Sequence, residues 1–260
     1  MVMIGFTVKK TFLDLWDNAL RISLINLLFI ALAAIIIVLQ WLLRPFPVLS
    51  ALVVLLGIIM GGILMCCTTL CVSAISDYET FGTLGFKTNL RPSLKNGILM
   101  GLFYGSCFIA FSFVMPFYLM LNSMFGLLIA CLLFWFFFAS CVALQFFFSL
   151  RRRENYGIKQ SIKRCFLIFV DNPLFCLFCF LFSIFLFAIS AVTGFIFPGA
   201  AGVMLFLDEA LRLRLLKYNQ SFTAEANRAG AKINWYALLS SDIEKTGSRS
   251  LKSLFFPWKD

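Results

Sequence analysis

The side chains that most often carry acid–base and metal chemistry are scarce in this chain. None of its 260 residues is histidine, which excludes a histidine general base, a Ser-His-Asp triad and histidine-ligated metals. Only twelve carboxylates are present, and almost all fall between long apolar runs. No pair of them stands inside an apolar run at a spacing suited to metal binding or glycoside hydrolysis. We therefore predict no catalytic residue, no metal ligand, no cofactor and no enzymatic activity.

Nine cysteines are the other reactive groups in the chain. Eight lie inside apolar runs, and Cys165 sits at the edge of one. Cys176 and Cys179 have CxxC spacing, but redox chemistry needs an accessible thiolate, which phenylalanine-rich apolar surroundings oppose. We interpret the cysteines as buried free thiols that pack as small hydrophobic side chains.

An Asp-Asn pair precedes two of the apolar runs. Asp17-Asn18 and Asp171-Asn172 both fit the pattern F-L-x-x-x-D-N-x-L, and a weaker copy around Asn96 precedes a third run at a nearly equal interval. The near-constant spacing predicts three similar helical hairpins. Repeats of this kind can frame a substrate site in transporters. We favour the alternative that Asp and Asn cap helix starts, with Asp171 at the interface.

The elements that carry these residues are predicted to be membrane helices. Hydrophobic residues make up 62% of the chain and charged residues 13%, with a mean hydropathy of +0.96. Soluble domains have about 45–50% and about 25%, respectively. A span needs about 20 apolar residues, so the uncharged intervals predict an all-α bundle of six spans. The expected spans are 22–43, 48–72, 97–120, 124–149, 173–190 and 194–210.

The charged residues predict the orientation of this bundle. Of the 22 Lys and Arg residues, Arg44 alone would lie on the side opposite the termini. By the positive-inside rule, the amphipathic segment 1–21 and the tail 211–260 are cytoplasmic, and 22–210 forms the bundle. We expect a multi-pass membrane protein with both termini on the cytoplasmic side.

Small residues in two of the spans predict close helix packing. Gly97, Gly101 and Gly105 form a double GxxxG pattern in the third span, and Gly57 and Gly61 repeat the spacing in the second. Such spacing lets helix backbones approach closely. The pattern leaves open whether the seam lies within one chain or joins two protomers.

The basic residues also bear on partners. Although the formal charge is +10, Lys and Arg flank apolar runs, so we expect no nucleic-acid binding. Basic and aromatic residues alternate before the first and fifth spans, which is typical of segments in contact with anionic lipid headgroups. A membrane-protein partner or a homo-oligomer is also expected.

The hairpin layout, together with the C-terminal motif Phe256-Pro257-Trp258-Lys259, resembles the YesL-like family of bacterial membrane proteins and its spirochaete-type members. That family has no assigned catalytic residues. Some members accompany carbohydrate importers, so the resemblance implies an accessory role. Together with the charge distribution, it also implies a place in the bacterial cytoplasmic membrane. The first functional hypothesis is thus an accessory or scaffold component of a membrane transport or envelope complex. The second is a small transporter or channel subunit, and the third is a membrane enzyme acting on lipid. The substrate-binding residues are unknown under each of them.

Overall fold

The computed structural model describes residues 2–79, 84–221 and 244, and the regular elements within this part of the chain are helices. In chain order they are α1 (Val2–Asp17), α2 (Ala19–Leu42), α3 (Pro47–Ser76), α4 (Leu84–Ile109), the π-turn η1 (Ala110–Val114), α5 (Met115–Met120), α6 (Met124–Leu144), α7 (Phe147–Glu154), α8 (Ile158–Asp171), α9 (Pro173–Val192) and α10 (Gly199–Ser221). The expected all-α architecture is confirmed for these residues. The tail from residue 222, including the motif at 256–259, lies outside them except for Glu244.

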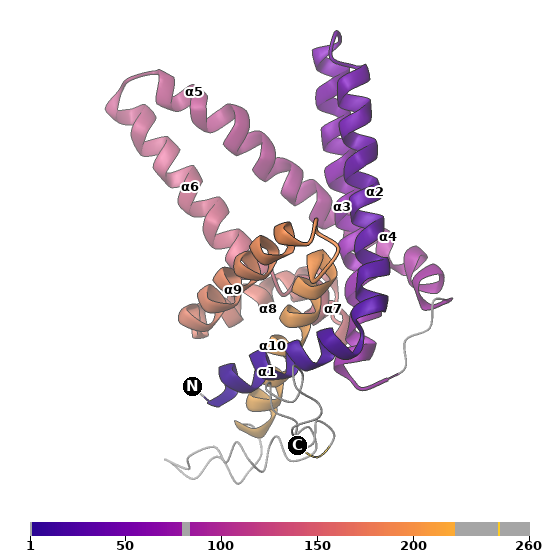
Figure 1. The fold of residues 1–260 in the computed structure, drawn as a ribbon. Helices are drawn as coiled ribbons and strands as arrows, with labels where there is room; N and C mark the ends of the chain where they lie inside the picture. Colours follow the sequence, from indigo (N-terminus) through magenta and orange to yellow (C-terminus); the bar gives the residue numbers. More distant parts are fainter. Residues whose placement is uncertain (1, 80–83, 222–243, 245–260) are drawn as a thin grey trace.

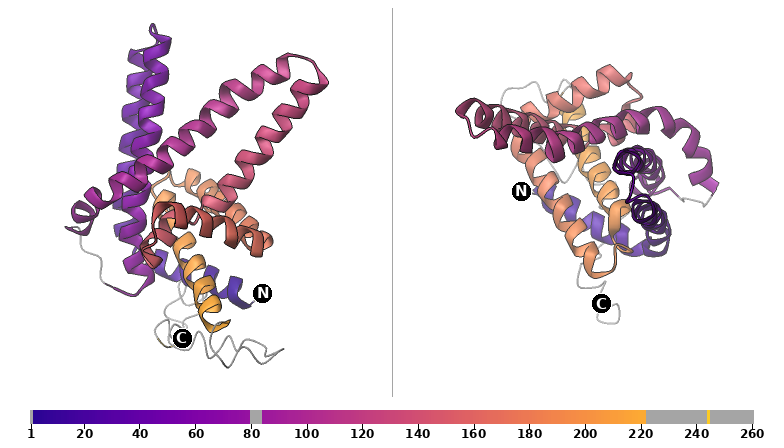
Figure 2. Two further views of the ribbon diagram at one scale, coloured as in Figure 1. Left: turned by 180° about the vertical axis from the view of Figure 1, so that it is seen from behind. Right: turned by 90° about the horizontal axis from the view of Figure 1, so that it is seen from above.

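The helices form two long hairpins and one shorter hairpin that share a base (Figure 1). The α2–α3 hairpin and the hairpin of α4–α5 with α6 diverge as they leave this base. The shorter hairpin, α9–α10, lies between them and ends well below their tips (Figure 2). Helices α1, α7 and α8 and the last turns of α10 make up the base.

Helix α1 turns sharply into α2 at Asn18. The backbone hydrogen bonds continue through the turn, because Asn18 N donates to Asp14 O at 3.1 Å and Ile22 N donates to Asn18 O at 3.0 Å. Helix α1 therefore lies across the base while α2 rises from it (Figure 1). Leu13 and Leu15 of α1 are both buried.

A π-turn joins α4 to α5 and has a clear local cause. Pro116 lies just after η1, and a proline ring lacks an N–H and collides with the carbonyl four residues earlier. One wider turn absorbs this conflict without ending the helix. Residues 84–120 therefore run as one long helical arm, which α6 follows after a turn capped by Ser123 Oγ, an acceptor for Gly126 N at 3.1 Å.

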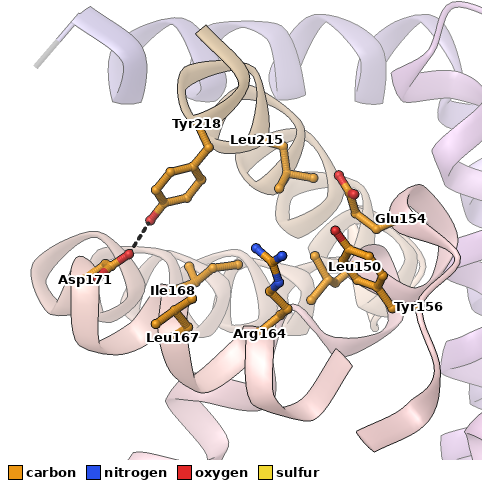
Figure 3. A pocket seen from close by; sticks show the side chains of 9 residues that line it. All are labelled: Leu150, Glu154, Tyr156, Arg164, Leu167, Ile168, Asp171, Leu215 and Tyr218. Atoms are coloured by element: carbon orange, nitrogen blue, oxygen red, sulfur yellow. Dashed lines mark hydrogen bonds between the residues drawn. The ribbon is translucent and has the colours of Figure 1, made fainter. Parts of the chain in front are cut away.

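The apolar core sits in the base rather than along the hairpins. Two clusters of buried side chains fill it, and α10 contributes to both, with Phe206 and Leu211 in one and Leu205 in the other. Helix α8 lies beside the first cluster, where a cavity opens between α7, α8 and α10 (Figure 3). The central helix of the fold is thus α10.

Within the part of the chain that the structure describes, five helical segments are long and apolar enough to cross a membrane. They are Ala19–Leu42, Pro47–Ser76, Thr88–Met120, Met124–Glu154 and Pro173–Val192, and they contain the first five expected spans almost entirely. The expected sixth span, 194–210, has no counterpart among them. Residues 194–198 form a non-helical loop, and α10 carries four charged residues between 208 and 214.

Candidate functional site

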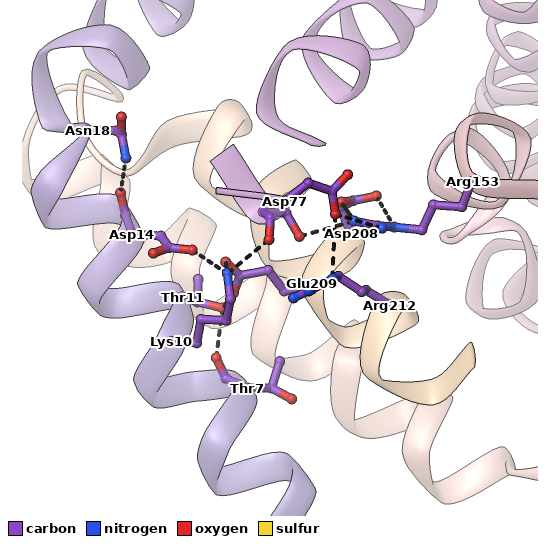
Figure 4. A network of polar contacts seen from close by, with 11 residues as sticks. Thr7, Lys10, Thr11, Asp14, Asn18, Asp77, Arg153, Asp208, Glu209 and Arg212 are labelled. Atoms are coloured by element: carbon purple, nitrogen blue, oxygen red, sulfur yellow. Dashed lines mark hydrogen bonds and ion pairs between the residues drawn. The ribbon is translucent and has the colours of Figure 1, made fainter. Parts of the chain in front are cut away.

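Seven charged side chains from four elements meet in the base and form the most elaborate polar arrangement in the described part of the chain (Figure 4). Helix α1, the end of α3, α7 and α10 bring them together. We call this group the charge cluster, and it consists of Lys10, Asp14, Asp77, Arg153, Asp208, Glu209 and Arg212.

Lys10 is the centre of the first half of the cluster. Its side chain is only 1% exposed, and its Nζ forms an ion pair with Asp14 and another, at 3.1 Å, with Glu209 Oε1. Nζ also donates to Ser76 O at 3.3 Å and lies 4.5 Å from the centre of the Tyr78 ring. Burial lowers the pKa of Lys10, but Glu209 and Asp14 outweigh it and raise the pKa above its usual value. The ammonium group is therefore held in its charged form.

Glu209 is fully buried and faces Lys10 and Thr11. Thr11 Oγ1 donates a hydrogen bond to Glu209 Oε2. Burial raises the pKa of Glu209 well above its usual value, against the opposing effect of Lys10. Any change that removes the Lys10 charge would therefore favour the protonated carboxyl group.

Arg153 is the centre of the second half of the cluster. Its Nε and Nη2 donate to the two carboxylate oxygens of Asp208, with Nε to Oδ1 at 3.1 Å. Nη1 donates to Asp77 Oδ1 at 3.0 Å, and Nη2 donates to Ser76 Oγ at 3.1 Å. Arg212 Nε also reaches Asp77 Oδ1 at 3.5 Å. The planar fork of arginine suits this bidentate contact with a buried carboxylate.

Two sequence neighbours link the halves. Asp208 and Glu209 are consecutive in α10, where successive side chains point about 100° apart, so one faces Arg153 and the other faces Lys10. Ser76 joins the halves from the other side, because its carbonyl accepts from Lys10 and its hydroxyl accepts from Arg153. The cluster thus ties α1, α3, α7 and α10 into one unit.

The arrangement is suited to holding helices together. Buried charges are tolerated when each has a partner, and removal of one partner is costly. The carboxylates of the charge cluster are all engaged by cations or hydroxyls, and within the described ranges no group of three or more Cys, Asp or Glu is placed to bind a metal. The ion pairs of the cluster therefore hold α1, α3, α7 and α10 together.

A second buried polar contact fixes the loop of the shorter hairpin. Asn26 of α2 is 1% exposed, and its Nδ2 donates to Pro198 O at 2.7 Å and to Ile196 O at 2.9 Å. Its Oδ1 accepts from Ala201 N at 2.9 Å. This side chain satisfies loop carbonyls and one of the free N–H groups at the start of α10.

The predicted Asp-Asn pairs do not cap by their side chains. Asn18 and Asn172 do precede α2 and α9, but neither side chain makes a capping hydrogen bond. Asn172 Nδ2 instead donates to Tyr218 Oη at 2.8 Å, and Asn18 Nδ2 to Asp14 O at 3.1 Å.

The other predicted polar positions lie apart from the charge cluster. Asp17 ends α1, and Asp171 ends α8, where it accepts from Tyr218 Oη at 3.4 Å. Asn96 lies inside α4, well after its start at Leu84, so the third copy of the motif does not open a helix. The structure does not bring these positions together.

The glycine seam lies within the chain, between α3 and α4. A Cβ at Gly101 would meet Ile59 Cα at 2.6 Å, and one at Gly97 would collide with Ile63 Cα. Gly57 faces the Ile36 side chain of α2. Gly61 meets no atom within 4 Å, and Gly105 meets only a Leu55 methyl at 3.7 Å. On α3 the close approach is made by Gly62, whose Cβ would lie 2.6 Å from Gly97 O.

The nine cysteines are free thiols, as the sequence predicts, and seven of them are buried, including Cys176 and Cys179. The prediction of burial is wrong for Cys131, which is exposed, and Cys141 is half-buried. The charge cluster and Asn26 were missed by the sequence analysis. One signal was present in the sequence: Asp208 and Glu209 directly follow an uncharged apolar stretch, with no turn residue between. This order places two carboxylates on the same helix as the apolar residues before them.

Comparison of the chain with protein-family models, curated proteins and solved structures found no match in any of the three. Its function is therefore inferred from the geometry of the molecule.

Proposed function

We propose that the protein is a multi-pass component of a bacterial cytoplasmic membrane with both termini on the cytoplasmic side. The three hairpins support this orientation because each leaves from the base and returns to it (Figure 1). Among the residues that the structure describes, the Lys and Arg residues other than Arg44 lie in the base or near the base ends of the helices, which agrees with the positive-inside rule.

The proposal includes six membrane-inserted segments, with a shallow third hairpin. Asn26, which holds the α9–α10 loop, is the eighth residue of α2. At 1.5 Å per residue it lies about 10 Å from the start of that helix, well short of the ~30 Å hydrocarbon thickness. The α9–α10 hairpin thus enters from the base and returns, and the termini stay on one side.

Within this membrane, we infer an accessory or scaffold role in a transport or envelope complex. One observation carries the inference: the chain ties its base together firmly but leaves the two long hairpins apart. Only 17% of the apolar central part of α2, and the same share of α3, is buried within the chain. Leu132 on α6 is 62% exposed. The exposed apolar faces of the long hairpins can contact helices of a partner protein.

The geometry gives less support to transport of a polar solute. A cavity of about 510 Å³ lies between α2, α3 and the tip of the α9–α10 hairpin, but its lining is apolar and includes Phe29, Ala33 and Phe187. The three cations and four carboxylates of the charge cluster are engaged with one another in ion pairs. These features suit lipid chains or partner helices.

Site-specific photo-crosslinking in intact cells tests the accessory role. A photoreactive side chain at Leu132 should give a covalent adduct with another membrane protein, identified by mass spectrometry. The matched control is Leu211, which is 0% exposed in the base and should give adducts only within the chain. Adducts at Leu132 with lipid alone would overturn the proposal.

A further inference from the structure

The cavity between α7, α8 and α10 combines unneutralised charges of both signs with an apolar floor (Figure 3). Its volume is about 160 Å³, which is several times the ~30 Å³ share of one water molecule. Leu150 and Ile168 are buried in its floor, and Leu167 and Leu215 complete the apolar lining. A small polar group with an attached apolar portion would fit this space.

Arg164 is the cationic group of the cavity. Its side chain extends from α8 toward α10, as Figure 3 shows, and its guanidinium carbon lies 5.3 Å from the centre of the Tyr156 ring. The ion pairs of the described residues all belong to the charge cluster, and none includes Arg164. A guanidinium group in this setting can bind a phosphate with two parallel hydrogen bonds.

Two carboxylates line the same cavity. Glu154 is the last residue of α7, and Asp171 is the last residue of α8, where Tyr218 donates to it. Neither carboxylate forms an ion pair with Arg164 across the cavity. They would repel a purely anionic ligand, and they would accept hydrogen bonds from an ammonium group.

The cavity also lies at a level of the protein where membrane headgroups are expected. Glu154 ends the candidate span Met124–Glu154, and Asp171 precedes the candidate span that begins at Pro173. The exposed side of α8 carries Lys159 and Lys163, whereas Ser161, Cys165 and Ile168 are buried. This pattern is typical of a helix lying in the interface plane.

We propose that this cavity binds a zwitterionic group that carries both a phosphate and a primary ammonium, with phosphate on Arg164 and ammonium on Glu154, the carboxylate at the Tyr156 end of the cavity. The apolar floor would take the adjoining glycerol and the first methylenes of a phospholipid such as phosphatidylethanolamine. The same chemistry is present in free phosphoethanolamine, so the test must separate these two sources.

The test uses the full chain, purified in detergent, and measures the thermal unfolding midpoint while short-chain phospholipids are added. Phosphatidylethanolamine should stabilise the protein at lower concentrations than phosphatidylglycerol, which lacks the ammonium. Arg164→Gln should weaken this binding about tenfold, as expected for loss of a charge-assisted contact worth ~1.4 kcal/mol. Lys163→Gln, on the same helix but outside the cavity, should leave binding unchanged.

Free phosphoethanolamine is the second arm of the test. Weaker stabilisation than by the lipid assigns the site to a membrane headgroup, and equal stabilisation assigns it to a soluble ligand; both outcomes support the site. Glu154→Gln should reduce the preference for phosphatidylethanolamine over phosphatidylglycerol. Equal effects of the two lipids on the unaltered protein, or equal losses in the Arg164 and Lys163 variants, would overturn the proposal.

Discussion

The base of the molecule and the outer halves of its long hairpins are built on opposite principles. The base combines two apolar clusters with seven charged groups that are paired across four elements. The outer halves are almost entirely apolar, and side chains such as Phe125, 80% exposed, and Leu132 contact little of the chain.

This contrast shows where the fold is specified. In lipid, apolar side chains gain little by leaving the surrounding hydrocarbon, so helix association depends on close packing and polar contacts. The charge cluster provides such contacts in the base, and the α3–α4 glycine seam provides them midway along α3. The tips of the hairpins provide fewer. We expect substitutions to become less damaging from the base outward.

The largest effect is expected at Arg153. Arg153→Met would leave the buried carboxylate of Asp208 without its cation, which costs about 3–5 kcal/mol for a buried pair. The control is Arg152→Met, because Arg152 is exposed and belongs to none of the ion pairs of the described residues. Scanning fluorimetry in detergent measures both variants. Equal unfolding midpoints for the two would show that the cluster does not hold the base.

Lys10 and Glu209 allow a sharper test because both partners can be replaced. Lys10→Met should destabilise the protein by about 3 kcal/mol, and adding Glu209→Gln should recover most of the loss, since the fully buried carboxylate is then removed and the remaining one, Asp14, is 15% exposed. Lys9→Met is the matched control for the single change. A double variant as unstable as Lys10→Met alone would mean that shape, rather than charge, is decisive.

The stability of the Lys10→Met variant should depend on pH in a defined direction. Burial raises the pKa of Glu209, and without Lys10 the folded state would hold its proton more firmly than the unfolded state does. Stability is then retained at low pH and lost as pH rises. The Lys10→Met penalty should therefore be large at pH 8 and should shrink toward pH 5, as compared with the unaltered protein.

Long apolar runs and charge asymmetry were sufficient to predict the five candidate spans, because they follow from local composition alone. The charge cluster was not predictable in this way, since Lys10 and Glu209 are separated by 199 residues and charges beside a span look solvated in the sequence. Asn26 was likewise counted as one more uncharged residue of the first span. The Asp-Asn pairs misled because their sequence similarity does not extend to their hydrogen bonds.

The glycine seam tests an intermediate level of the contrast. Gly101→Ala would place a methyl group against the Ile59 backbone and should cost about 1–3 kcal/mol, as overpacking does. Gly105→Ala has room and should be neutral or stabilising by up to about 1 kcal/mol through helix propensity. Unfolding midpoints of the two variants decide the point. Similar losses at both positions would indicate that the helix as a whole, rather than one contact, is sensitive.

The smallest effect on the isolated chain is expected in the outer half of α6. Phe125→Ala and Leu132→Ala remove exposed side chains and should change the free energy of unfolding by less than about 0.5 kcal/mol. The same variants should reduce recovery of a partner protein from membranes, because the exposed apolar face of α6 would lose contact surface. A loss of stability without a loss of partner would contradict the scaffold role, since the outer halves would then serve this chain alone.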